Sequence, residues 1–166
     1  MYVVLMAMLA LNVSTEVLEG FSLVEESLHR TTTNSASENA AIYGDFEAQM
    51  KANPQKVKVW FDKATAVKRM SDSLYNFAQE LKVAIVKEAD GEDGDVFNIE
   101  RKDDLEAANQ VMLAPGTGRG KELFDAINSF RERILTMVTD ERQKAIISSN
   151  LTTTLPKNAR TMGKNW

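Results

Sequence analysis

The segment from Met1 to Val13 constrains this chain more than any other. Every side chain in it is apolar or aromatic except that of Asn12, and the first ionisable side chain is Glu16. A bilayer-spanning helix needs about 20 predominantly apolar residues, whereas shorter runs are more often core helices or parts of signal peptides. A secretory signal opens with a basic segment, but the first basic residue here is Arg30. We therefore expect a membrane helix that begins upstream of Met1 and ends near Val13, with a buried core helix as the alternative.

Charge and composition indicate the character of the chain beyond this segment. Lysine and arginine favour the cytoplasmic flank of a membrane helix, and none occurs before Arg30, so we expect the following domain outside the cytoplasm. The chain has 166 residues, 43% of them hydrophobic, and no cysteine, which excludes disulfides and thiol chemistry. Its net charge of −4 does not suggest a nucleic-acid partner. We expect a membrane helix over residues 1–15 and one folded domain over residues 16–166.

The clearest helical signal begins at Asn53-Pro54, where Asn suits the N-cap and Pro the first helical position. Apolar residues then recur in steps of four and three, as in a coiled-coil seam. The Gly-Glu-Asp-Gly-Asp run after Asp90 cannot sustain a helix, so we expect it to end near Asp90-Gly91. The seam comprises Trp60, Ala64, Val67, Ser71, Leu74, Ala78, Leu81 and Ile85. We expect Trp60 and Phe61 to pack in the core or at the end of a bundle.

Other segments also show helical spacing. A strong stripe runs from Leu123 through Ile127, Phe130 and Ile134 to Met137, and two weaker stripes lie at residues 17–28 and 40–50. No segment sustains the alternation of a strand, and the run at residues 96–99 is the only strand-like candidate. The pattern predicts an all-α fold, namely a membrane helix followed by a bundle of about four helices.

Two segments resemble ligand loops but lack the required residues. The run Ala114–Lys121 is rich in glycine, yet Pro115 and Glu122 stand where a phosphate-binding loop needs Gly and Ser or Thr. We expect a helix–helix loop there. The acidic run Asp90–Asp95 fails the spacing of an EF-hand, because Asp95 stands where that loop needs Gly. We expect a solvated turn.

Candidate catalytic groups are equally sparse. His29 is the only histidine, so neither a Ser-His-Asp triad nor a histidine metal cluster has enough members. We expect it at the surface, beside a Thr-rich bend. Asp103 and Asp104 are adjacent and would point different ways on a helix. The sequence predicts no enzyme, and no catalytic, cofactor-binding or metal-binding residue.

Several strings resemble the GldM/PorM family, the inner-membrane motor proteins of type IX secretion and gliding motility. The segment Met1–Phe21, with its core Ala-Met-Leu-Ala-Leu-Asn-Val-Ser, is similar to the family's membrane helix and its exit. Further strings resemble the family's first periplasmic domain, so that the similarity covers nearly the whole chain. They are Asn39–Tyr43, Asn53-Pro54 with Lys56-Val57-Lys58, Trp60–Ala64, Ser71–Tyr75, Asp104–Ala108 and Val111–Leu113.

The resemblance implies a homodimer and a set of partners. The membrane helices of two chains would sit within a ring of helices from GldL (PorL), and proton flow through that complex would drive rotation. The periplasmic part would pass this motion, through later domains, to a GldK/GldN-like ring associated with the outer membrane. Localisation would be the inner membrane, single-pass, with most of the chain in the periplasm. The family's basic residue, which pairs with a partner glutamate, would lie upstream of Met1.

Within the membrane segment, Tyr2 matches a family tyrosine that faces the partner ring. We expect the partner-facing positions to be Tyr2, Leu5, Met8, Leu9 and Asn12. The small side chains of Ala7 and Ala10 would let two helices approach closely, so we expect them at the dimer contact. An alternative is the helical sensor domain of a membrane receptor. A second apolar run after Trp166 would favour that receptor, whereas Leu151–Trp166 is polar.

Overall fold

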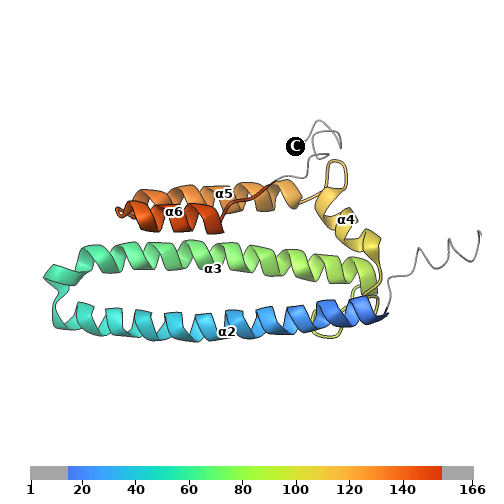
Figure 1. Ribbon diagram of the computed structural model, residues 1–166, viewed down its shortest axis with the longest axis horizontal. Coiled ribbons are helices and arrows are strands. Elements are labelled where there is room, and N and C mark those ends of the chain that lie inside the picture. Colours follow the sequence, from blue (N-terminus) through green and yellow to red (C-terminus); the bar gives the residue numbers. More distant parts are fainter. Residues whose placement is uncertain (1–14, 155–166) are drawn as a thin grey trace, which may run out of the picture. The chain divides into compact units, whose positions relative to one another are not determined.

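The computed structural model describes residues 15–154, and every regular element within them is an α-helix (Figure 1). The helices are α2 (Thr15–Ala52), α3 (Pro54–Asp90), α4 (Leu105–Leu113), α5 (Gly120–Met137) and α6 (Glu141–Asn150). For the described part of the chain the all-α prediction is confirmed, with five helices in residues 15–154 where about four were expected. In the described part of the chain, no helix combines the length and the apolar character that a membrane span requires.

The chain divides into two compact units, Met1–Phe61 and Asp62–Trp166. In the first unit, the two weak apolar stripes belong to one helix, because α2 runs for 38 residues, about 57 Å. The Thr-rich bend expected beside His29 is wrong, since residues 31–33 are helical. Their hydroxyls donate to carbonyl oxygens one turn earlier at 2.9, 2.9 and 3.0 Å, so these polar groups are satisfied without a break. His29 is exposed, as expected.

The junction between α2 and α3 lies where the sequence predicts it. The Asn53 amide donates to the carbonyl oxygen of Gln49 at 2.8 Å, and the Asn53 carbonyl accepts from the Val57 amide at 3.2 Å. Pro54 has no N–H to continue the hydrogen bonding of α2, so a new helix begins there. Of the two placements expected for Trp60, the core is wrong, because its side chain, in the first turns of α3, is 58% accessible. Packing at the end of a bundle stays a prediction. Phe61 is half-buried.

In the second unit, α5 runs antiparallel to α3. The guanidinium carbon of Arg119, just before α5, lies 4.9 Å from the ring centroid of Phe77, midway along α3. At the other end of α5, the Met137 carbonyl accepts a hydrogen bond of 3.4 Å from the ammonium group of Lys63. Helices α4 and α6 both contact α5, and α6 returns alongside it (Figure 1).

The most buried side chains of the second unit gather near the end of α3. Leu81, Val86 and Ala89 on α3 and Ala107 on α4 are each 3–6% exposed. The predicted stripe of α5, from Leu123 to Met137, is half-buried throughout. The core therefore lies where α3, α4 and the segment between them meet.

Residues 91–104 join α3 to α4 and contain the one strand-like run. Asp95 and Asn98 form an isolated β-bridge within a tight turn, and no strand occurs in residues 15–154. Helix α3 ends at Asp90, as predicted. Gly91 follows with φ of +94°, a left-handed conformation that suits glycine at a helix end.

Candidate functional site

The residues predicted to act in the membrane lie outside the described residues. They are the partner-facing Tyr2, Leu5, Met8, Leu9 and Asn12 and the dimer-contact Ala7 and Ala10. Candidate surfaces in residues 15–154 are therefore built from the helices that begin at Thr15.

The first candidate is an exposed apolar row on the N-terminal half of α2, which we name the α2 seam. It consists of Val17, Phe21, Val24 and Leu28, whose side chains are 48–66% exposed. The residues follow one another in steps of four, three and four, so they share one face of the helix. Beyond Leu28, the next position in this series is the polar Thr31. Large apolar side chains in an exposed row indicate an interaction surface.

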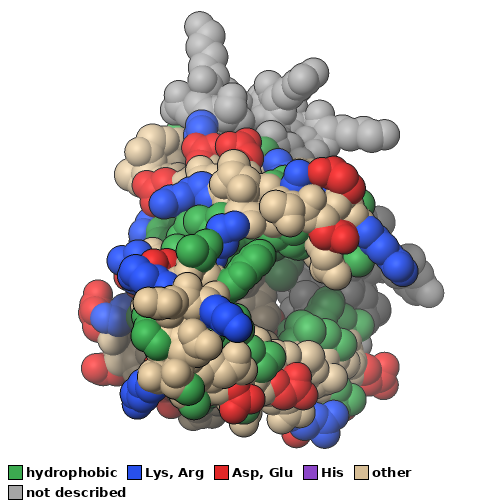
Figure 2. All heavy atoms as spheres, turned by 90° about the vertical axis from the view of Figure 1, so that its left-hand side faces the viewer, with side chains coloured by type: hydrophobic (Ala, Val, Ile, Leu, Met, Phe, Trp, Pro, Cys, Tyr) green, Lys and Arg blue, Asp and Glu red, His purple; other side chains and the backbone are tan. Residues whose placement is uncertain are grey.

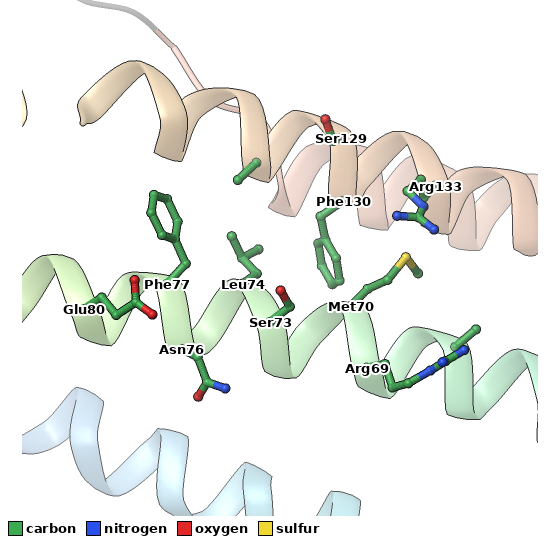
Figure 3. A pocket seen from close by; sticks show the side chains of 12 residues that line it. Arg69, Met70, Ser73, Leu74, Asn76, Phe77, Glu80, Ser129, Phe130 and Arg133 are labelled. Atoms are coloured by element: carbon green, nitrogen blue, oxygen red, sulfur yellow. The ribbon is translucent and has the colours of Figure 1, made fainter. Parts of the chain in front are cut away.

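The second candidate is an open pocket of about 730 Å³ between α3 and α5, which we name the α3–α5 groove. Figure 3 shows Met70, Leu74 and Phe77 of α3 and Phe130 of α5 directed into the space between the two helices. These four side chains are half-buried and form an apolar floor. The rim is polar, with Ser73, Asn76 and Ser129 exposed along it.

The two ends of the α3–α5 groove differ in charge. At one end, the Arg119 guanidinium lies over Phe77, 3.7 Å from the Glu80 carboxylate and 3.2 Å from that of Glu122. At the other end lie Arg69 from α3 and Arg133 from α5 (Figure 3). Within residues 15–154, neither of these two guanidinium groups forms an ion pair.

The segment at residues 91–104, which we name the acidic loop, is held by one carboxylate. Asp90 accepts hydrogen bonds from the backbone amides of Glu100 and Arg101 at 2.9 and 2.8 Å. The Arg101 guanidinium donates to the Ala89 carbonyl at 2.8 Å and pairs with Asp104 at 2.7 Å. The predicted solvated turn is thus an ordered loop, and Phe97 at its tip is 88% exposed.

An ion pair also joins α3 to the acidic loop. The Lys87 ammonium donates a 2.8 Å hydrogen bond to the Glu92 carboxylate. This hydrogen bond, together with the attraction of the opposite charges, lowers the pKa of Glu92 and raises the pKa of Lys87. Both groups are open to solvent, so the pair is a weak and salt-sensitive link.

The segments that resembled ligand loops have structural roles. Residues 114–119 connect α4 to α5, as expected, and Gly118 donates its amide to the Ala114 carbonyl at 2.8 Å. Asp104 caps α4 by accepting from the amides of Glu106 and Ala107 at 3.0 and 3.1 Å. In the part of the chain that the structure describes, no three His, Cys, Asp or Glu side chains are grouped as a metal site.

Sequence reasoning missed two of these arrangements. Helix α6 was not predicted, although Asp140 followed by Gln143 has the spacing of a capping box. The Asp140 carboxylate indeed accepts from the Gln143 amide at 2.8 Å. The pairing of Arg119 with Phe77 and Glu80 carries no local signal, because the end of α3, the acidic loop and α4 separate these residues in the chain.

The charges on one face of the described residues are of both signs. On the face shown in Figure 2, basic and acidic side chains are mixed with apolar and neutral ones.

Comparison with models of protein families gives a match. The family model described as the GldM N-terminal domain matches residues 16–166. It therefore covers all of the described helices apart from the first residue of α2. No curated protein matches the chain.

Proposed function

The chain belongs to the GldM family, and from this premise we propose that it is part of a proton-motive-force-driven membrane motor. The family is a membrane-associated, structural component of the gliding and type IX secretion machinery and is not a known family of enzymes. In the proposed role, residues 16–166 form the periplasmic domain that transmits motion from the membrane to the secretion apparatus.

The proposed membrane part is residues 1–15, as the end of a single inner-membrane span. Its partner is a ring of GldL-like helices, which would face Tyr2, Leu5, Met8, Leu9 and Asn12. An apolar helix surface without charge suits a helix that turns inside such a ring, because no ion pair fixes its rotation. Later domains would carry the motion to a GldK/GldN-like ring.

The observation that carries the proposal is the α2 seam. Its heptad spacing continues upstream through Ser14 and Ala10 to Ala7, in steps of three, four and three. The two alanines proposed as the dimer contact in the membrane therefore share one register with Val17 and Phe21. A single parallel seam would join two chains from the membrane into α2.

The exposure of the α2 seam supports this dimer energetically. Full burial of a Val, Leu or Phe side chain contributes about 1.5–3 kcal/mol, and these side chains are now at least 48% exposed. Two copies that covered the seam along its whole length would each bury several such side chains. A second identical chain is the partner that would present the same apolar row in the same direction.

Cysteine crosslinking tests the dimer, because the chain has no cysteine of its own. We expect Phe21→Cys and Val24→Cys in the full-length protein to form intermolecular disulfides in native membranes. The matched control is Leu23→Cys, which is 69% exposed but lies off the seam. A dimer held elsewhere would crosslink the control as well as the seam variants, and would refute this arrangement.

An insertion tests the transmission of motion. A flexible Gly-Ser stretch of seven residues after Ser14 should abolish secretion and gliding, while GldL-like partners still co-purify. The control is an insertion of seven helix-forming residues at the same place, which keeps the heptad register and should retain function. Normal secretion and gliding with the flexible insertion would refute the proposal that α2 transmits torque.

A further inference from the structure

The α3–α5 groove has a feature that the proposed motor role does not use. Arg69 and Arg133 reach its one end from two different helices, and both are exposed (Figure 3). Within the described helices and loops, neither pairs with a carboxylate. Guanidinium groups bind carboxylates and phosphates with paired hydrogen bonds. This end of the groove is therefore suited to an anion.

The opposite end offers no comparable site. Its cation, Arg119, already faces the Glu80 and Glu122 carboxylates and the ring of Phe77. An anion that approached this end would meet two carboxylates. The groove is thus polarised, with uncompensated positive charge at only one of its ends.

Between the ends, the floor is apolar. Met70, Leu74, Phe77 and Phe130 are half-buried and line the groove. Methionine and phenylalanine suit a loosely shaped apolar ligand, because the methionine side chain adapts its conformation and the aromatic ring offers a large contact area. An elongated apolar group would cover this floor and exclude water from it.

The size of the groove fits a small molecule. A volume of about 730 Å³ lies within the range of about 300–1,000 Å³ that is usual for ligand sites. On α3 the lining runs from Ala66 to Glu80, which is about 21 Å at the rise of an α-helix. The site is therefore elongated along α3.

From these features we propose that the α3–α5 groove binds a single-chain amphiphile with an acidic head group. The carboxylate or phosphate head lies between Arg69 and Arg133, and the alkyl chain lies along Met70, Leu74 and Phe130 toward Phe77. A cationic amphiphile is disfavoured by the two arginines. A neutral amphiphile would form no ion pair with either arginine.

Photo-crosslinking of the full-length protein, held in nanodiscs of zwitterionic lipid, tests the proposal. The probe is a fatty acid that carries a diazirine on its chain, and labelled peptides are mapped by mass spectrometry. We expect labels within residues 66–80 and 126–133. Dodecanoate and dodecyl phosphate should both compete, whereas dodecyl maltoside, dodecyl trimethylammonium, acetate and inorganic phosphate should not.

Variants then distinguish recognition of the charged head group from non-specific hydrophobic binding of the probe. Arg69→Gln combined with Arg133→Gln should reduce labelling of the groove about tenfold, as expected for the loss of two solvent-exposed charged contacts. The matched control is Lys82→Gln, an exposed cation on α3 that does not line the groove. It should label like the unmodified protein, and circular dichroism should show equal helix content in all variants.

Equal competition by the neutral maltoside would overturn the proposal, and so would unchanged labelling of the double arginine variant or labels that map outside the groove. Displacement of the probe by an acidic amphipathic peptide at lower concentration than dodecanoate would also overturn it, since the groove would then serve a protein helix. The test measures labelling of the groove and not secretion or gliding, so its result is independent of the proposed motor role.

Discussion

Removal of the Asp90 carboxylate should loosen the connection between α3 and α4. In the variant Asp90→Ala, the backbone amides of Glu100 and Arg101 lose their acceptor, which now lies at 2.9 and 2.8 Å. The acidic loop then has lost its main tie to the end of α3. Because Ala107 of the following helix belongs to the small core, the change should destabilise the second unit rather than the loop alone.

The size of the effect can be worked out from these contacts. A hydrogen bond to a charged group contributes about 1.5–3 kcal/mol, and the lower figure applies here because both bonds are open to solvent. Two such bonds give about 3 kcal/mol. A carboxylate in the last turn of a helix is itself unfavourable by about 0.5 kcal/mol, since it faces the negative end of the helix dipole. The free energy of unfolding should therefore fall by about 2.5 kcal/mol.

Urea unfolding followed by circular dichroism measures this loss, and hydrogen exchange locates it. The amides of Glu100 and Arg101 should exchange faster in Asp90→Ala, and to a smaller degree in Asp90→Asn, whose amide oxygen replaces one of the two acceptor oxygens. The control is Asp93→Ala, an exposed acid in the same loop, with an expected change below about 0.5 kcal/mol. Equal stability of Asp90→Ala and Asp93→Ala would refute the role given to this carboxylate.

Three further predictions concern stability, each measured by denaturant unfolding of the variant beside the unmodified chain. Gly118→Ala should cost about 1–3 kcal/mol, because its Cβ would lie 2.7 Å from a carbonyl oxygen of α4, whereas Gly20→Ala meets no atom within 4 Å and should stabilise α2 by about 1 kcal/mol. Leu81→Ala should cost about 3 kcal/mol, since this side chain is 3% exposed; a loss below about 1 kcal/mol would contradict its place in the core. Glu92→Gln should flatten the pH dependence of the free energy of unfolding. In the unmodified chain, the contribution of Glu92 is complete above about pH 4.3 and is lost as the pH falls through its lowered pKa. The contribution of Lys87 is complete below about pH 10.4 and is lost as the pH rises through its raised pKa. High salt should weaken the same contribution, and an unchanged pH profile in Glu92→Gln would contradict it.

The sequence predicted those parts of the fold that local chemistry determines. Helix α3 begins at Pro54, which lacks an amide hydrogen, and ends just before Gly91, which adopts φ of +94°. The apolar stripe of α5 is also a local signal, since its spacing alone predicts a helix. The continuity of α2 was missed, because three consecutive threonines suggest a bend, and only the structure shows that their hydroxyls bond within the helix.

The candidate sites depended on contacts between distant segments. Arg69 and Arg133 belong to one groove only because α5 runs back along α3, and no spacing in the sequence predicts that pairing. Asp90 was considered as the start of a calcium-like loop, whereas its two acceptor oxygens are used by amides ten and eleven residues further on. A carboxylate that closes a loop and one that binds a cation have the same local sequence, so the distinction needed coordinates.

The distribution of burial links the fold to the proposed dimer. Within residues 16–154, the buried apolar side chains are Leu81, Val86, Ala89 and Ala107, all near the end of α3, and none belongs to α2. Helix α2 instead exposes the α2 seam, although helices in proteins gain most of their stability from packing an apolar face. A helix about 57 Å long that transmits force must resist bending, and propensity alone does not provide this, since residues 31–33 are poor helix formers. Pairing along the seam would supply that stiffness nearest the membrane, where the proposed torque enters the chain.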